Sequence, residues 1–176
     1  MAEKALLGLL KEAIDMEKRG QKFYSDMSRK CTNEITGKTF AFLAENEAKH
    51  IESIKNFYET MRKEGKFPSF NLESDRGERK EALRIFSKNI KNLAEKIKPD
   101  ENDLEACQFA MDFENNGYRY YKDMLGKTKD GNLVELLKFL LDEESAHYEG
   151  IKDLHTYLAD SKNWYMYEEE SFPQGG

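Results

Sequence analysis

The sequence predicts an all-α protein, a four-helix bundle built from two pseudo-symmetric helical hairpins. Charged residues make up 35% of the chain and only three prolines are present, a composition typical of long, well-solvated helices. Apolar residues recur at three- and four-residue steps along most of the chain, which is the period of amphipathic helices. The two halves also resemble each other at a constant offset of 97 residues. A period this long indicates a duplicated hairpin and not a solenoid repeat.

Each of the four long helices is bounded by residues that cap or break helices. Their expected ranges are about 4–29, from the cap Thr32 or Asn33 to about 63, from the cap Asp100 or Asn102 to about 125, and about 132–158. A further helix at 77–97 is expected within the long connection, about 65–99, which lets the second hairpin enter from the other end of the bundle. The bundle is expected to occupy residues 1–160, and 161–176 to form an aromatic and acidic tail, partly ordered at best.

Charge and composition exclude several classes of function. The net charge is −6 and no basic cluster stands out, which argues against a nucleic-acid partner. No apolar run approaches the roughly 18 residues that span a bilayer, and the acidic, amphipathic N-terminus is not expected to be a signal peptide. Cys31 and Cys107 form neither a metal-type spacing nor a disulfide framework, so we expect a cytoplasmic, reducing location. Cys107 is interpreted as a buried structural thiol.

The repeat carries the residues with the most chemistry. Each half holds a glutamate, a tyrosine seven residues later, and a Glu-x-x-His motif thirty residues after the first glutamate. The eight residues are Glu17, Tyr24, Glu47 and His50 with their counterparts Glu114, Tyr121, Glu144 and His147. One Glu-x-x-His is weak evidence for a site, because many helices carry it by accident. Four coincident positions at one offset are strong evidence.

Helical geometry brings these residues together. Glu17 and Glu47 lie at equal distances from the first turn, so an antiparallel pair of helices holds them at the same height, and the same holds for their counterparts. Within each Glu-x-x-His, a three-residue step keeps both side chains on one face. Tyr24 and Tyr121 lean back toward the glutamates, because helical side chains point toward the N-terminus. They are better placed to donate hydrogen bonds to the ligands than to act as ligands.

Electrostatics then favour a metal. Four carboxylates facing one bundle core repel one another and are costly to desolvate. Two divalent cations would neutralise them, and two neutral imidazoles would complete the set. Oxygen-rich ligation with one histidine per metal suits iron or manganese better than structural zinc. The sequence therefore predicts a dinuclear metal site.

Two further groups of residues surround the predicted ligands. Gly20 and Gly117 each follow a glutamate by three residues, and a mid-helix glycine costs about 1 kcal/mol relative to alanine. They are expected either to leave room beside the metals or to permit close helix contact. The remaining nearby acids are interpreted as solvated faces or as contacts around the ligands: Glu45, Glu52, Glu143 and Glu149.

With these paired motifs, residues 3–158 resemble the ferritin-like superfamily, specifically the rubrerythrin group. The resemblance implies a ferritin-like bundle with two iron ions, manganese being the alternative, and a homodimer. It also implies the ligand roles: Glu17 and Glu114 terminal, Glu47 and Glu144 bridging, and His50 and His147 one on each iron. Two features depart from the group. The rubredoxin-type Cys-x-x-Cys pair is absent from the sequence, and Asn115, Asn116 and Gly117 follow Glu114, so no seventh carboxylate is expected at the site.

The resemblance implies an oxidoreductase that reduces hydrogen peroxide or dioxygen. Because the rubredoxin-type pair is absent, electrons are expected from an external donor such as a rubredoxin-like protein. Three alternatives stay open at this point: a ferroxidase or iron-storage protein of the ferritin type, a hydroxylase with a pocket opening onto the metals, and a metal-free helical interaction module.

Overall fold

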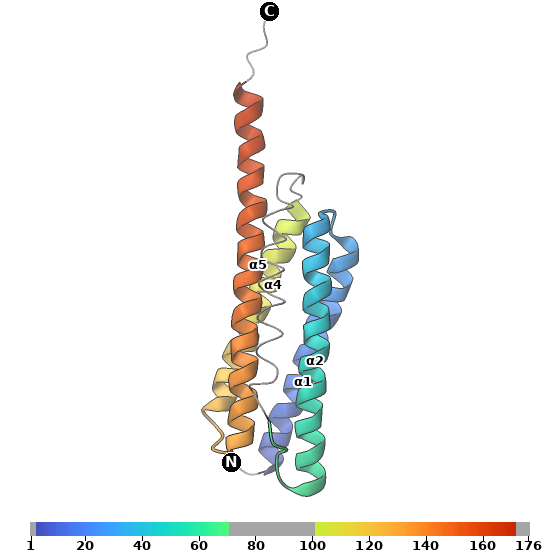
Figure 1. Ribbon diagram of the computed structural model, residues 1–176, viewed down its shortest axis with the longest axis vertical. Coiled ribbons are helices and arrows are strands. Elements are labelled where there is room, and N and C mark those ends of the chain that lie inside the picture. The colour runs from blue at the N-terminus through green and yellow to red at the C-terminus, as the bar shows by residue number, and fades with distance from the viewer. Residues whose placement is uncertain (1–2, 71–100, 172–176) are drawn as a thin grey trace, which may run out of the picture.

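The computed structural model describes residues 3–70 and 101–171, with side chains for 4–70 and 102–160. These residues form four helices and no strand (Figure 1): α1 (Glu3–Lys30), α2 (Glu34–Glu64), α4 (Glu101–Leu125) and α5 (Gly131–Ser171). α1 packs mainly on α2, and α4 mainly on α5, as two antiparallel hairpins. The predicted all-α four-helix bundle is confirmed. Among the described helices, none combines the length and apolar character needed to cross a membrane.

Capping residues set the helix ends close to where the sequence predicts them. The Asn33 side chain accepts hydrogen bonds from the first backbone N–H groups of α2, at 2.9 Å from Ile35 and 3.3 Å from Thr36. Gly65 ends the same helix in the left-handed conformation, with φ of 69°, and its N–H donates to the carbonyl of Met61 at 2.9 Å. Glycine adopts this conformation without the steric cost that a side chain brings.

The two hairpins enter the bundle from opposite ends. In Figure 1, α2 ends at the bottom of the bundle, whereas α4 begins at the top. The end of α2 and the start of α4 therefore lie at opposite ends of the bundle, as predicted for two hairpins joined by a long connection. The predicted helix at 77–97 lies outside the described residues.

The fourth helix is longer than the sequence analysis predicted. We expected it to end at about residue 158 and to be followed by a tail from 161, but α5 continues to Ser171 and projects beyond the other helices (Figure 1). The prediction was wrong because it took the mixture of aromatic and acidic residues from Ser161 on as a tail. No glycine or proline lies between Gly150 and Pro173, so nothing in the sequence breaks the helix before that proline.

Two apolar clusters form the core, one toward each end of the bundle. The first contains Leu10, Ile54 and Leu136, with residues from all four helices, and the second contains Phe40, Ala110 and Leu154. The repeated glutamates and histidines fall between these clusters along every helix. They are therefore held in a polar layer with low-dielectric surroundings on both sides, where unpaired charge is costly.

Candidate metal centre

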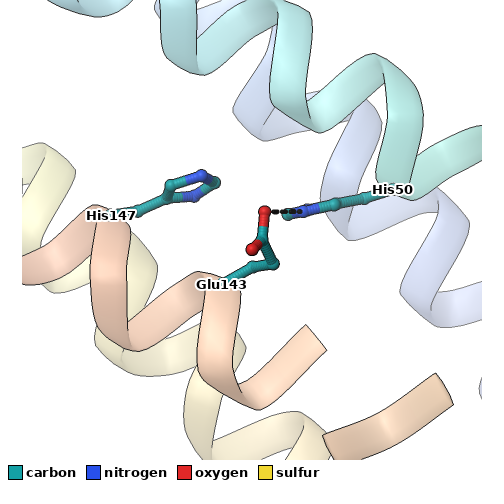
Figure 2. A group of neighbouring side chains, drawn as sticks. All are labelled: His50, Glu143 and His147. Atoms are coloured by element: carbon teal, nitrogen blue, oxygen red, sulfur yellow. Dashed lines mark ion pairs between the residues drawn. The ribbon is translucent and has the colours of Figure 1, made fainter. Parts of the chain in front are cut away.

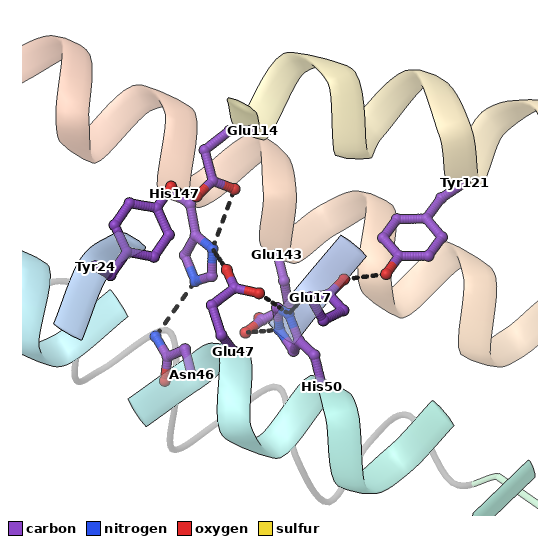
Figure 3. A network of polar contacts seen from close by, with 9 residues as sticks. All are labelled: Glu17, Tyr24, Asn46, Glu47, His50, Glu114, Tyr121, Glu143 and His147. Carbon is purple, nitrogen blue, oxygen red and sulfur yellow. Dashed lines mark hydrogen bonds and ion pairs between the residues drawn. The ribbon is translucent and has the colours of Figure 1, made fainter. Parts of the chain in front are cut away.

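The six predicted metal ligands are buried in the middle of the bundle. Each helix supplies a glutamate, and α2 and α5 each add a histidine from their Glu-x-x-His motif. Figure 3 shows five of the six, all but Glu144. None of the six is more than 2% exposed: Glu17, Glu47, His50, Glu114, Glu144 and His147. Burying this many ionisable groups costs free energy unless they are paired with one another or with a cation.

Five of the six ligands form two groups that share Glu47. Ligand atoms of Glu17, Glu47 and His50 lie within 4.8 Å of one another, and so do those of Glu47, Glu114 and His147. The two Glu47 oxygens face different histidines: Oε2 is 3.8 Å from Nδ1 of His50, and Oε1 is 3.8 Å from Nδ1 of His147. This is the arrangement of a carboxylate that can bridge two cations.

The sixth predicted ligand, Glu144, lies beside Glu114 and against the backbone of α4. A Cβ added at Gly117 would stand 2.9 Å from Oε2 of Glu144 and 3.3 Å from its Oε1, so the glycine makes room for this carboxylate. At the equivalent Gly20, an added Cβ would meet the Phe113 ring at 2.5 Å and the Glu47 carboxyl carbon at 3.5 Å. Gly20 and Gly117 therefore leave space beside equivalent glutamates of the two halves, Glu47 and Glu144.

The two tyrosines donate hydrogen bonds to glutamates, and each reaches across to the opposite hairpin. The phenol of Tyr24 on α1 donates to Oε1 of Glu114 on α4, and that of Tyr121 on α4 donates to Oε1 of Glu17 on α1 (Figure 3). The lean of the side chains predicted donation toward the glutamate layer. It did not predict that each tyrosine contacts the glutamate of the other hairpin.

Two further residues contact the histidines: Asn46, which sequence reasoning missed, and Glu143, which it left open between a solvated face and a contact around the ligands. Nδ2 of Asn46 lies 3.3 Å from Nε2 of His147, and Oε2 of Glu143 lies 3.7 Å from Nε2 of His50 (Figure 3). Asn46 and Glu143 each precede a histidine of the same helix by four residues, a spacing that places both side chains on one face. That spacing was the signal in the sequence.

Glu143 also corrects one prediction. The absence of a glutamate after Glu114 led us to expect no seventh carboxylate at the site, but α5 supplies one, buried and in contact with His50. The other three acids left open between solvated faces and ligand contacts are exposed: Glu45, Glu52 and Glu149.

The pKa values of the buried glutamates are shifted in opposite directions. Burial and the neighbouring charge of Glu17 raise the pKa of Glu47 well above its ordinary 4.5, and burial and Glu114 do the same to the pKa of Glu144. Burial would also raise the pKa of Glu17, but contacts with Glu47, His50 and Tyr121 outweigh it and lower that pKa. Closely spaced carboxylates cannot all ionise, so without a cation some of them must hold protons.

The remaining ionisable groups are tuned by the same carboxylates. Burial would raise the pKa of Glu114, but contacts with His147, Glu144 and Tyr24 lower it. Burial would lower the pKa of His50, but the carboxylates around it, Glu17 first, raise that pKa well above its ordinary 6.5. The pKa values of Tyr24 and Tyr121 are raised by burial and by nearby glutamates, so both phenols keep their protons and act as donors.

The chemistry of the site fits two divalent cations. Five buried lone-pair atoms of the predicted ligands have no hydrogen-bond partner within the described parts of the chain: Glu47 Oε1, Glu47 Oε2, His50 Nε2, Glu114 Oε2 and His147 Nδ1. A buried polar atom without a partner costs about 1–3 kcal/mol, and more when it is charged. Carboxylate oxygens with one imidazole per position are ligands that iron and manganese accept.

A surface pocket of about 320 Å³ reaches the centre between α4 and α5. Glu114 and Glu144 line it, together with Asn115, Tyr118, Ser145 and Tyr148. Two of the predicted ligands are therefore in contact with a space large enough for a small molecule.

A four-helix bundle in which every helix contributes a glutamate to one buried centre, and two helices add a histidine, is a ferritin-like carboxylate protein. A sequence model described as Rubrerythrin matches residues 8–155, and the chain belongs to this ferritin-like di-iron family. A solved structure of a hypothetical protein from Pyrococcus furiosus has a similar fold, with a TM-score of 0.64 and 22% identity over 91% of this chain and 94% of that chain. No curated protein matched the chain.

Proposed function

We propose that the centre holds two iron ions and that the protein reduces hydrogen peroxide or dioxygen with electrons from an external donor. The observation that carries this proposal is the buried set of four glutamates and two histidines, in which Glu47 faces both histidines. A pair of ferrous ions supplies the two electrons that reduce one hydrogen peroxide, with two protons, to two waters. Membership of a di-iron family supports iron over manganese.

In this proposal the residues of the chain divide into ligands and residues that orient them. Glu17 with His50, and Glu114 with His147, would each hold one ion, and Glu47 and Glu144 would be shared. The hydrogen bonds from Tyr24 to Glu114 and from Tyr121 to Glu17 fix the orientation of the unshared carboxylates. Holding ligands in place in this way lowers the reorganisation needed when the charge at the centre changes.

The pocket between α4 and α5 supports access by a small oxidant. Glu114 and Glu144, which are at most 2% exposed, form its inner lining, and Asn115, Ser145 and two tyrosines offer polar groups around it. Hydrogen peroxide and dioxygen are far smaller than its 320 Å³. The same pocket would also be needed for an organic substrate, so oxidants and organic substrates must be compared by experiment.

The proposed donor is external because the chain's thiols do not form an iron site. The sequence contains two cysteines, Cys31 and Cys107, and no Cys-x-x-Cys pair. Burial raises the pKa of Cys107 to about 12, so the thiolate that binds iron or attacks a disulfide is not readily formed. A rubredoxin-like protein is the type of donor we propose.

Metal analysis and anaerobic stopped-flow kinetics test the proposal together. Purified protein should contain close to two metal ions, and Glu47→Ala should lose most of them, whereas Glu52→Ala, an exposed glutamate on the same helix, should keep them. The reduced, iron-loaded protein should be oxidised by hydrogen peroxide or dioxygen much faster than free ferrous ion. A low metal content that Glu47→Ala leaves unchanged would refute the metal centre, and oxidation no faster than that of free ferrous ion would refute the reaction.

Iron storage is the alternative to be separated from this function. A storage protein assembles into a large shell, whereas we propose a homodimer. Light scattering of the purified protein distinguishes the two masses. A shell, together with more iron per chain than two sites can hold, would favour storage over oxidant reduction.

A further inference from the structure

The two histidines of the centre have different partners on the side away from the shared carboxylates. Nδ1 of His50 lies 3.3 Å from Glu17, and Nδ1 of His147 lies 3.4 Å from Glu114. A cation held by either carboxylate would therefore bind the neighbouring imidazole through Nδ1. On the other side, Nε2 of His50 faces the Glu143 carboxylate at 3.7 Å, whereas Nε2 of His147 faces the amide of Asn46 at 3.3 Å (Figures 2 and 3).

Asn46 and Glu143 occupy equivalent positions of the repeat, since they are 97 residues apart. Each belongs to one hairpin and contacts the histidine of the other, and both are buried, at 3% and 7% exposed. The glutamate, tyrosine and histidine positions that the repeat pairs around the centre hold identical residues in the two halves. An amide on one side and a carboxylate on the other therefore break the symmetry next to the ligands.

This difference changes the donor strength of the two imidazoles. When Nδ1 binds a cation, Nε2 carries the ring proton, and an acceptor for that proton raises the basicity of the ligand nitrogen. The Glu143 carboxylate facing His50 can accept it in a charge-assisted hydrogen bond, whereas the Asn46 atom nearest Nε2 of His147 is the amide nitrogen, which is a donor. The Glu143 carboxylate also adds negative charge, closest to His50 at 3.7 Å and within 4.8 Å of a ring nitrogen of His147, whereas Asn46 adds none.

We propose that Glu143 makes the metal position at His50 bind a divalent cation more tightly than the position at His147, so that the two positions fill in order. Glu143 acts as a positioning residue through His50, and Asn46 is its weaker counterpart at His147. The inference rests on the proposed metal centre but not on the proposed reaction with an oxidant.

Stepwise metal binding tests this proposal. Metal-free protein is titrated anaerobically with ferrous ion in a calorimeter, and with cobalt(II) while the absorption of the bound ion is followed. Wild-type protein should show two binding steps whose affinities differ about tenfold or more. Residues that hydrogen-bond to metal ligands change metal affinity by this amount. Glu143→Gln should weaken the first step about tenfold and leave the second unchanged. Glu149→Gln, an exposed glutamate on the same helix, should change neither step.

Further variants assign the steps and guard against misfolding. His147→Ala should keep the tight step and lose the weak one, and His50→Ala should do the reverse. Asn46→Asp, which preserves the size of the side chain, should strengthen the weak step, and the double variant Asn46→Asp/Glu143→Gln should reverse the order of filling.

The outcomes separate the two proposals. Absence of metal binding in the wild-type protein would refute the proposed function and this inference together. Two ions bound with equal affinity would overturn only the inference. A tight step that survives Glu143→Gln would also overturn it, and if that variant does not fold, an unchanged weak step in Asn46→Asp would do so.

Discussion

The orientation of two glutamates depends on single atoms, the hydroxyl oxygens of Tyr24 and Tyr121. Each phenol donates to one oxygen of a glutamate in the opposite hairpin, and each ring is fully buried. The Tyr24 ring also stacks on Phe40, with 5.7 Å between centroids, so its packing does not depend on the hydroxyl. Loss of the hydroxyl should therefore disturb the centre more than the fold.

We predict that Tyr24→Phe and Tyr121→Phe each lower the affinity for divalent metal about tenfold, because a ligand carboxylate loses the donor that orients it. Equilibrium titration with cobalt(II) measures the change. Tyr120→Phe is the control, since that phenol donates at 2.7 Å to the backbone carbonyl of Leu9. Equal metal affinity in Tyr24→Phe and wild type would show that the phenol does not orient the ligand.

The space beside Gly117 gives a second prediction at the scale of one residue. Gly117→Ala should displace the Glu144 carboxylate, whose Oε2 would lie 2.9 Å from the new Cβ, and so reduce the metal content. Gly8→Ala, where the added Cβ would have no atom within 4 Å beyond the adjacent backbone of α1, should instead stabilise α1 by about 0.5–1 kcal/mol through helix propensity. Metal analysis and thermal unfolding of both variants provide the measurements, and full metal content in Gly117→Ala would contradict the prediction.

At this scale the sequence predicts residues that repeat and overlooks residues that differ between the halves. The glutamates, tyrosines and histidines were found because they coincide at one offset. Asn46 and Glu143 coincide in position but not in type, so a search for identical residues passed over them. Each precedes a histidine of its own helix by four residues. This spacing predicts a position beside the ligands only once the helix face that carries the ligands is known.

Among the helices, α4 is tied to the other hairpin by Asp103. This buried carboxylate accepts hydrogen bonds from the backbone N–H groups of Thr32 and Asn33, at 3.3 and 2.9 Å, in the turn that joins α1 to α2. The repeat does not predict this contact, because the position equivalent to Asp103 is Leu6. A buried carboxylate bound to backbone donors stabilises a turn that could otherwise leave those groups unpaired.

We predict that Asp103→Ala lowers the free energy of unfolding by about 1–3 kcal/mol, because the buried N–H of Asn33 and the partly buried N–H of Thr32 lose their acceptor. Chemical unfolding of metal-free protein measures the loss, and the metal stoichiometry should stay unchanged because Asp103 lies at the turn and not among the ligands. Asp112→Ala, an exposed aspartate on the same helix, should change stability by less than about 0.5 kcal/mol. A similar loss in both variants would contradict the role given to Asp103.

The helix ends show which boundaries can be predicted well from the sequence. Asn33 and Gly65 act through local backbone geometry, and the structure has both where the sequence predicts them. The end of α5 was predicted from the mixture of aromatic and acidic residues from Ser161 on, a composition that does not break a helix. Its continuation to Ser171 escaped the prediction for that reason.

For the whole molecule, protonation of the centre opposes the binding of metal. The pKa values of Glu47 and Glu144 are raised above 4.5 in the folded protein, so above pH 4.5 the folded state keeps protons that the unfolded chain releases. The contribution of these two groups to the free energy of unfolding of the metal-free protein therefore falls as pH rises above 4.5. Glu17 and Glu114 have lowered pKa values, so their contribution is lost only as pH falls below 4.5.

We predict that metal stabilises the protein more at about pH 8 than at about pH 5.5, because bound cations replace protons that Glu47, Glu144 and His50 otherwise hold. The apparent affinity should rise about tenfold per pH unit for each proton displaced. Thermal unfolding with and without metal measures the stabilisation, and calorimetry in buffers of different ionisation enthalpy counts the protons. Metal binding without proton release would contradict the prediction.

The pairing of helices within hairpins has a consequence for how the protein responds to its surroundings. Each hairpin packs mainly on itself, and the layer where the two hairpins meet contains the repelling glutamates. Two ions bound by residues of all four helices would cross-link the hairpins there, in the way that a disulfide joins distant segments. Protein made without its metal would lack these cross-links and would be more readily opened and degraded by proteases, so its abundance would follow the supply of that metal.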